Sequence, residues 1–250
     1  MPASLTRPLP FTVLASDEHT ATAPARNTLD DRPGKVWRTT TNAGYIVIDL
    51  GSAAYDTVVI VGTNLTASDT VRIRTGTDTT AVGAFDRTVP AMTGTKPTGF
   101  TTKTFVQLSE TRSERYMRID FVSAAPVEVQ RIVIGPSVTT IGIDHEADEA
   151  VLDTSEINTV LGVDTIQTGL KKLRWKFTMS RISETDWRNS WKSFLYAVGK
   201  TQPVVFVPFV EAPSSWQSDI TFGRIRNDVS AKIPGMIYRV VEMTVEGISI

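Results

Sequence analysis

Two histidines, His19 and His145, are the side chains best suited to act as a catalytic base near neutral pH. A hydrolytic triad needs a nucleophile beside such a base and an acid that orients it. No G-x-S-x-G nucleophile motif accompanies either histidine, and the chain has no cysteine. His19 lies in a polar segment, where a solvated loop position is the simpler interpretation. We therefore predict no catalytic residue and expect that the protein is not an enzyme.

One cluster combines several metal-capable side chains: Asp144, His145, Glu146, Asp148 and Glu149. Its spacing matches neither the H-E-x-x-H zinc motif nor an EF-hand calcium loop. Acidic runs of this kind usually stay in solvent or pair with basic neighbours. No phosphate-binding loop or G-x-G-x-x-G motif is present either. We accordingly predict no metal site and no cofactor.

Cleavage of a polysaccharide would require two carboxylates flanking the scissile bond. The chain has 27 acidic residues, so such a pair has to be sought among many. Asp49 and Asp120 lie inside predicted strands, where both alternate outward from apolar neighbours. Neither has the apolar surroundings that raise the pKa of a carboxyl group. Polysaccharide hydrolysis is therefore the weakest of three functional hypotheses.

The composition restricts the partners further. With 26 basic and 27 acidic residues the net charge is -1, which does not favour nucleic acid or an anionic membrane surface. No apolar run approaches the roughly 18 residues that span a bilayer, and the N-terminal residues lack the apolar core of a signal peptide. We expect a protein made in a bacterial cytoplasm that folds without disulfides.

The first half of the sequence consists of short segments typical of strands. Apolar runs and strict alternation, separated by glycine-containing turns, predict strands over residues 45–50, 57–61, 71–74, 104–108, 116–121 and 127–134. Residues 76–103 are rich in Thr, Gly and Pro, and we expect long loops there with one weak strand. Several strands at this spacing without a helix indicate a β-sandwich or barrel.

The pattern changes after residues 135–136, a Gly-Pro pair that predicts a boundary between domains 1–136 and 137–250. One helix is predicted over 184–198, with Ser183 as its N-cap and Gly199 as its C-cap. Its apolar stripe comprises Trp187, Trp191, Phe194, Leu195 and Val198. Strands are expected over residues 138–143, 173–179, 203–210, 220–225 and 238–248, and a charged excursion over 144–156. The predicted fold class is all-β, with two β domains and one packed helix.

The first half resembles the galactose-binding-like (discoidin-type) family, whose fold is a jelly-roll β-sandwich. The resemblance covers roughly residues 20–136 and follows the order of NTLDDRPGKVWR, GYIVIDLG, DTVVIVGTNLT, VRIR, RYMRIDF and VQRIVIG. It implies that Trp37 closes one end of the sandwich as a structural seal, with Arg38 bracing the loop. Some members bind calcium where Asn27, Asp30 and Asp31 stand here, so calcium remains a minor alternative.

The second half is similar to distal-tail and other minor tail-tip proteins of long-tailed bacteriophages. The similarity rests on the arrangement of ETDWRNSWKSFLYAVG, KTQPVVFVPF and YRVVEMTVEGISI over about residues 137–250. It implies a ring-forming subunit, a homo-hexamer, in the tail tip of the virion of a phage or prophage. Its partners would be the tail tube, the tape measure and the tail hub. We expect the ring contacts on the strands over 203–210 and 238–248, with a contribution from the exposed face of the helix.

Two hypotheses from different classes thus remain. The first is a structural ring that links the tail tube to the host-recognition apparatus. The second is a carbohydrate-binding module that contacts host-surface glycans in host attachment. Polar contacts to a glycan are expected from loops and strand residues of the sandwich: Asn64, Arg72, Arg74, Asp78 and Arg118. Trp216 is either an exposed stacking or interface residue, or it folds over the helix.

Overall fold

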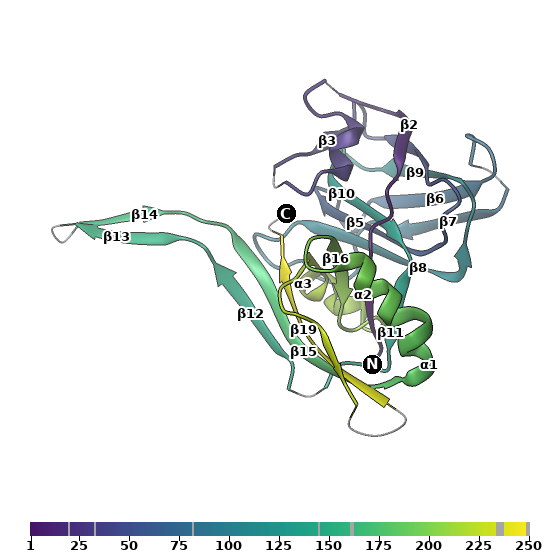
Figure 1. Ribbon diagram of the computed structural model, residues 1–250. Coiled ribbons are helices and arrows are strands. Elements are labelled where there is room, and N and C mark those ends of the chain that lie inside the picture. The colour runs from purple at the N-terminus through teal and green to yellow at the C-terminus, as the bar shows by residue number, and fades with distance from the viewer. Residues whose placement is uncertain are drawn as a thin grey trace.

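The computed structural model describes residues 1–19, 21–32, 34–81, 83–144, 146–160, 163–233 and 238–248. It confirms the predicted all-β fold class with one helical segment packed on a sheet (Figure 1). All the strand pairings described are antiparallel. No helix in these ranges is long and apolar enough to cross a membrane.

A β-sandwich forms most of the first half. Its outer sheet has five strands, in the order β2 (Thr12–Ser16), β4 (Tyr45–Asp49), β9 (Tyr116–Val122), β6 (Thr70–Gly76) and β7 (Phe85–Pro90). Its inner sheet has four, in the order β3 (Trp37–Arg38), β10 (Glu128–Gly135), β5 (Tyr55–Thr63) and β8 (Thr102–Arg112). β7 is the weak strand expected between residues 76 and 103.

The second half is built on an eight-stranded sheet. Along its path lie β11 (Ser137–Thr140), β1 (Ala3–Thr6), β16 (Pro203–Val207), β17 (Thr221–Ile225), β19 (Tyr238–Gly247), β15 (Lys171–Ser183) and β12 (Asp148–Asp153). β18 (Ser230–Lys232) pairs with β19 beside this path. The shorter helices are a 3-10 turn at Ala25–Leu29, another at Pro213–Ser215, and α3 (Trp216–Asp219).

The four-stranded sheet is a middle layer, buried on both faces. On β5, Val58 and Ile60 face the sandwich core, whereas Val59 and Val61 pack against the eight-stranded sheet. Burial on both sides explains why the sequence here is an unbroken apolar run instead of an alternating one. β16 repeats this arrangement, because Val205 faces the sandwich and Phe206 faces the helix.

The predicted helix over 184–198 is present as three continuous parts, α1 (Glu184–Asp186), a π-helical turn (Trp187–Trp191) and α2 (Lys192–Val198). The hydroxyl of Ser183 accepts a hydrogen bond from the Asp186 amide at 3.0 Å, and Gly199 adopts a φ of 53°. Trp191 and Phe194 are buried against the eight-stranded sheet. The helix therefore forms an outermost layer, on the far side of that sheet from the sandwich.

The boundary expected at residue 136 falls between β10 and β11, and the division into 1–136 and 137–250 stays a prediction. One strand does not follow this division of the sequence. β1 precedes the sandwich in the sequence but pairs with β11 and β16 in the eight-stranded sheet of the second half. No strand was expected there, since four residues are too few for periodicity to be recognised. The chain therefore begins in one sheet, makes the sandwich, and returns.

One expectation about the second half is wrong. The predicted charged excursion contains β12, an edge strand whose residues Asp148 and Asp153 lie opposite Lys176 and Lys171 on β15. Its charge suits an exposed edge, where polar side chains discourage unwanted pairing. The strands expected to make ring contacts, β16 and β19, are interior strands with partners on both sides. Their backbone groups are thus already used within the chain, and contacts through their side chains stay a prediction.

Candidate functional site

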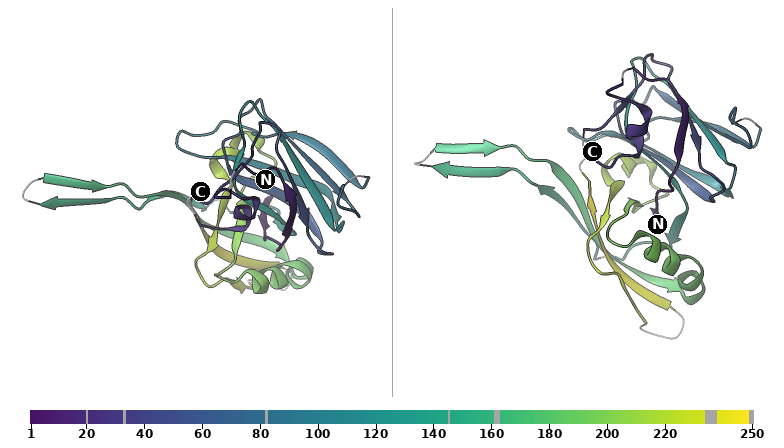
Figure 2. Two further views of the ribbon diagram at one scale, coloured as in Figure 1. Left: turned by 90° about the horizontal axis from the view of Figure 1, so that it is seen from above. Right: turned by 45° about the horizontal axis from the view of Figure 1, so that its top comes forward.

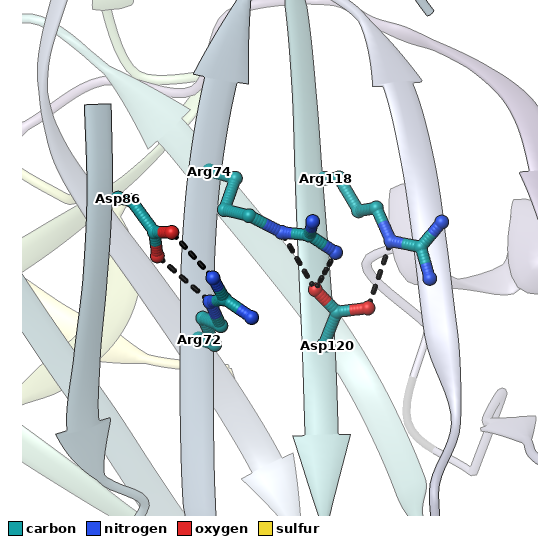
Figure 3. Close-up of polar contacts among 5 residues, drawn as sticks. All are labelled: Arg72, Arg74, Asp86, Arg118 and Asp120. Atoms are coloured by element: carbon teal, nitrogen blue, oxygen red, sulfur yellow. Dashed lines mark hydrogen bonds and ion pairs between the residues drawn. The ribbon is translucent and has the colours of Figure 1, made fainter. Parts of the chain in front are cut away.

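The predicted arginines lie together on the outer face of the five-stranded sheet, which we call the arginine face (Arg72, Arg74, Arg118, Asp86 and Asp120; Figure 3). β6 supplies Arg72 and Arg74, β9 supplies Arg118 and Asp120, and β7 supplies Asp86. Alternation positions them, because the intervening residues of β6 and β9 point into the sandwich core. Side chains of one face on adjacent strands are then neighbours.

Ion pairs connect these side chains in two separate groups, Arg72 with Asp86, and Asp120 with both Arg74 and Arg118. Arg72 donates through Nε to Asp86 at 2.7 Å and through Nη2 to the second oxygen of that carboxylate. Arg74 Nη2 donates to one oxygen of Asp120 at 2.6 Å, and Arg118 Nε donates to the other at 2.8 Å. Hydrogen bonds from Arg72 hold the pKa of Asp86 below its usual range. Three guanidinium groups against two carboxylates leave one net positive charge.

A hollow of about 330 Å³ lies over these ion pairs. Its lining includes Tyr45 and four members of the arginine face, namely Arg72, Arg74, Arg118 and Asp120. The guanidinium of Arg118 lies 4.3 Å from the centre of the Tyr45 ring, a cation–π distance that covers one side of the ring. Unused guanidinium N–H groups can donate to hydroxyl or carboxylate oxygens of a ligand. The hollow is therefore suited to a polar, weakly acidic ligand.

Two of the predicted contacts lie elsewhere. The Asn64 side chain donates to the Pro126 carbonyl at 2.9 Å and accepts from the Glu128 amide at 2.9 Å, so it fastens a loop. Asp78 accepts from the Thr80 amide at 2.9 Å within a turn. Neither residue lines the hollow. A side chain that satisfies its own loop has few polar atoms left for a ligand.

Trp216 packs between the two halves of the protein. It is partly buried, its ring meets Phe105 of β8 edge-on at 4.9 Å, and its Nε1 donates to the Phe209 carbonyl at 3.2 Å. It therefore neither stacks freely in solvent nor folds over the helix. The Pro213–Ser215 turn and α3 position its side chain. The sequence did not predict these two short helical elements, so it could not predict where the ring of Trp216 lies.

Trp37 is fully buried in the sandwich. Its Nε1 donates to the Asp17 carbonyl at 2.8 Å, and its ring lies edge-on to Phe121 at 5.7 Å. Arg38 is exposed and pairs with Glu128 at 3.4 Å. The contacts of Trp37 and Arg38 described here are all with residues of the same chain.

The two carboxylates considered as calcium ligands, Asp30 and Asp31, are paired with arginines. Arg32 donates to Asp30 and lowers the pKa of that carboxyl to about 2, while Asp31 pairs with Arg131 at 3.0 Å and Arg224 at 3.3 Å. The Asn27 side chain donates to the Val36 carbonyl at 2.7 Å. His145, from the acidic cluster, lies outside the described residues. Within the described ranges no group of three or more His, Cys, Asp or Glu could hold a metal ion.

A second candidate site was not predicted, and we call it the arm. It consists of β13 (Glu156–Val160) and β14 (Val163–Gln167), which extend β12 and β15 away from the body (Figures 1 and 2). Among the described strands, these two pair only with each other. Ile157 and Ile166 lie directly opposite each other and are 67% and 66% exposed. The sequence does carry a signal, because a two-residue link containing glycine joins two runs with β-branched residues.

No protein-family model matches the sequence, and no curated protein matches it. Among solved structures, one similar chain is a chitosan-binding module of a chitosanase/glucanase from Paenibacillus sp. IK-5, at 17% identity and a TM-score of 0.36, covering 49% of this chain and 92% of that chain. Another is a fucose-binding module of Streptococcus pneumoniae, at 15% identity and a TM-score of 0.35, covering 50% and 89%. A Ruminococcus gnavus GH29 fucosidase is similar at 17% identity and a TM-score of 0.38, covering 51% of this chain and 25% of that chain. Similarity this low carries no argument about function.

Proposed function

We propose that this protein is a structural subunit that associates with further copies of itself through the arm. The observation that carries the proposal is the arm itself, a ribbon that leaves the body with isoleucines in solvent. A two-stranded ribbon alone is marginally stable in water, and its open strand edges favour pairing with another chain. Contact with a neighbouring subunit would bury the isoleucines and stabilise the ribbon.

The specific form we propose is a ring in the tail tip of a long-tailed phage or prophage. An arm that docks on a different surface of the next subunit makes a head-to-tail contact, which closes into a ring or continues as a filament. A hexamer that joins the tail tube, tape measure and hub is the form that the resemblance of the second half implies. The arm supports self-association, and the tail assignment rests on that resemblance.

Removing the arm tests the proposal. Replacing residues 155–169 by Asn-Gly joins Thr154 to Leu170, whose backbones already form a 3.1 Å hydrogen bond, through a turn suited to a hairpin. We expect light scattering behind size exclusion to give a multiple of 27.4 kDa for the full chain and a monomer for the shortened one. The exposed apolar residue Val122 lies away from the arm, so Val122→Ser provides a control that should keep the assembly. A monomeric full chain, or an unchanged shortened one, would contradict the proposal.

A second candidate function, binding of a host-surface glycan, is favoured by the hollow over the arginine face. The excess positive charge there suits acidic polysaccharides such as those that contain uronate. The two functions are compatible, because the five-stranded sheet and the arm are separate parts of the molecule (Figure 1). A ring could therefore present one such hollow from each subunit.

We expect Arg118→Ala to weaken binding to a uronate-containing polysaccharide about tenfold or more, since a hydrogen bond to a charged group contributes roughly 1.5–3 kcal/mol. Isothermal titration at two salt concentrations measures this, and binding should weaken at the higher one. Arg87→Ala is the matched control, because Arg87 lies on the neighbouring strand β7 but does not line the hollow. Equal affinities of both variants, or no binding by the unaltered chain, would exclude this site.

A further inference from the structure

A groove beside the helix is the surface best matched to the arm. It has a volume of about 290 Å³ and lies between α2 and the segment that follows β17. Its apolar lining comprises Trp187, Leu195, Tyr196 and Val229, and Tyr196 is 81% exposed. Lys192 and Lys200 line it as well, and Lys200 pairs with Asp228 at 2.7 Å. The groove thus combines apolar surface with an excess of positive charge.

One face of the arm has the complementary chemistry. Ile157 pairs with Ile166, and Thr159 pairs with Asp164, in one antiparallel register. Directly opposite residues point to the same face, as do residues two apart, so both isoleucines and the Asp164 carboxylate share one face. β13 and β14 contain two acidic side chains, Glu156 and Asp164, and no Lys or Arg. The arm therefore offers an apolar pair with adjacent negative charge.

The arm and the helix lie on opposite sides of the body in all three views (Figures 1 and 2). An arm cannot reach the groove of its own chain in this arrangement, so a second copy must supply the ribbon. The contact between copies would then be head-to-tail, since the arm and the groove are different surfaces.

We infer that the groove of each subunit receives the arm of the next, with Ile157 and Ile166 against Leu195 and Tyr196, and Asp164 facing Lys192. This inference rests on the proposed self-association and names the surface that accepts the arm. It places the helix, which packs on the eight-stranded sheet within one chain, at the contact between chains.

Charge reversal tests the pairing in the full chain. We expect Lys192→Glu alone and Asp164→Lys alone each to raise the dissociation constant of the assembly at least tenfold, measured by analytical ultracentrifugation. The double variant should recover most of this loss, because the two charges attract again in the opposite sense. Lys232→Glu, a reversal at an exposed residue that does not line the groove, is the control. If the double variant assembled no more tightly than the single variants, the proposed contact between Lys192 and Asp164 would be overturned.

Disulfide cross-linking supplies a second measurement. The chain has no cysteine of its own, so every disulfide must form between the introduced residues. Oxidation of the chain with Ile166→Cys and Tyr196→Cys should give a ladder of covalent oligomers, whereas each single variant should give dimers at most. Ile141, exposed beside the open edge strand β11, marks another surface that could take the arm. If the ladder formed with the pair Ile166→Cys and Ile141→Cys, and not with the pair Ile166→Cys and Tyr196→Cys, the groove would not be the surface that accepts the arm. Self-association through the arm would still hold. An unaltered chain that stays monomeric would overturn both proposals.

Discussion

Replacing Phe206 by alanine should lower the free energy of unfolding by about 3–5 kcal/mol, which is the usual loss for a large aromatic in a core. Phe206 is fully buried on β16. Its ring stacks on Phe177 with centroids 4.2 Å apart and planes 3° from parallel, and Trp175 meets it edge-on at 5.9 Å. The cavity cannot collapse easily, because the strands that carry these rings are held in the eight-stranded sheet.

Urea unfolding followed by tryptophan fluorescence measures this loss. The shortened chain without the arm is the appropriate background, because association would otherwise add to the apparent stability. Leu14→Ala is the matched control: Leu14 is 45% exposed on β2, so its truncation should change the free energy by less than about 0.5 kcal/mol. A loss below about 1 kcal/mol for Phe206→Ala would contradict the packing described for the sheet and the helix.

Replacing Lys103 by methionine should remove a rise in stability between about pH 8 and pH 10.5. Lys103 lies on β8, and its buried ammonium donates to the Gln217 carbonyl at 3.0 Å. Burial lowers the pKa of this amine to about 8, against an opposing effect of Asp219. In an unfolded chain the pKa of lysine is about 10.4. Between these two values the unfolded chain binds more protons, so stability increases with pH by up to about 3 kcal/mol.

Measuring the free energy of unfolding at several pH values from 7 to 10.5 tests whether stability rises with pH as expected. The difference between the unaltered chain and Lys103→Met isolates this amine from other titrating groups. At pH 7 the methionine variant should be at least as stable, since it avoids burying a charge. Lys96→Met, at an exposed lysine, is the matched control for the substitution itself. Parallel curves for the unaltered chain and Lys103→Met would show that the ammonium is not desolvated in the folded protein.

Lys103 also shows how the two halves are joined. The Gln217 side chain accepts from the Lys103 amide at 3.0 Å and donates to the Lys103 carbonyl at 2.7 Å, as a neighbouring strand would. The valines of β5 and β16 pack beside it. The sandwich is thus held against the eight-stranded sheet by both apolar contact and buried hydrogen bonds.

Local sequence signals were enough to predict the fold class and most of the elements of the sandwich and the helix. Alternation in residues 71–74 and 116–121 specified which side chains face the core, and therefore which arginines share the outer face of the sheet. Ser183 and Gly199 marked the helix ends, because caps act on backbone groups within a few residues. These signals depend on neighbours in the chain, so they can be read without the fold. They were sufficient to predict Arg72, Arg74 and Arg118 as candidate contacts.

How these elements combine could not be predicted from the sequence, and the folded protein shows it. It brought β1 beside β16, placed the four-stranded sheet between two others, and paired Arg74 and Arg118 with one carboxylate. It also showed that the arm leaves the body, which the hairpin signal in its sequence does not reveal. The physical reason is that burial and strand pairing depend on segments distant in sequence, whereas period and capping are local. Whether an isoleucine packs within its own chain or awaits a neighbour is therefore a property of the whole fold.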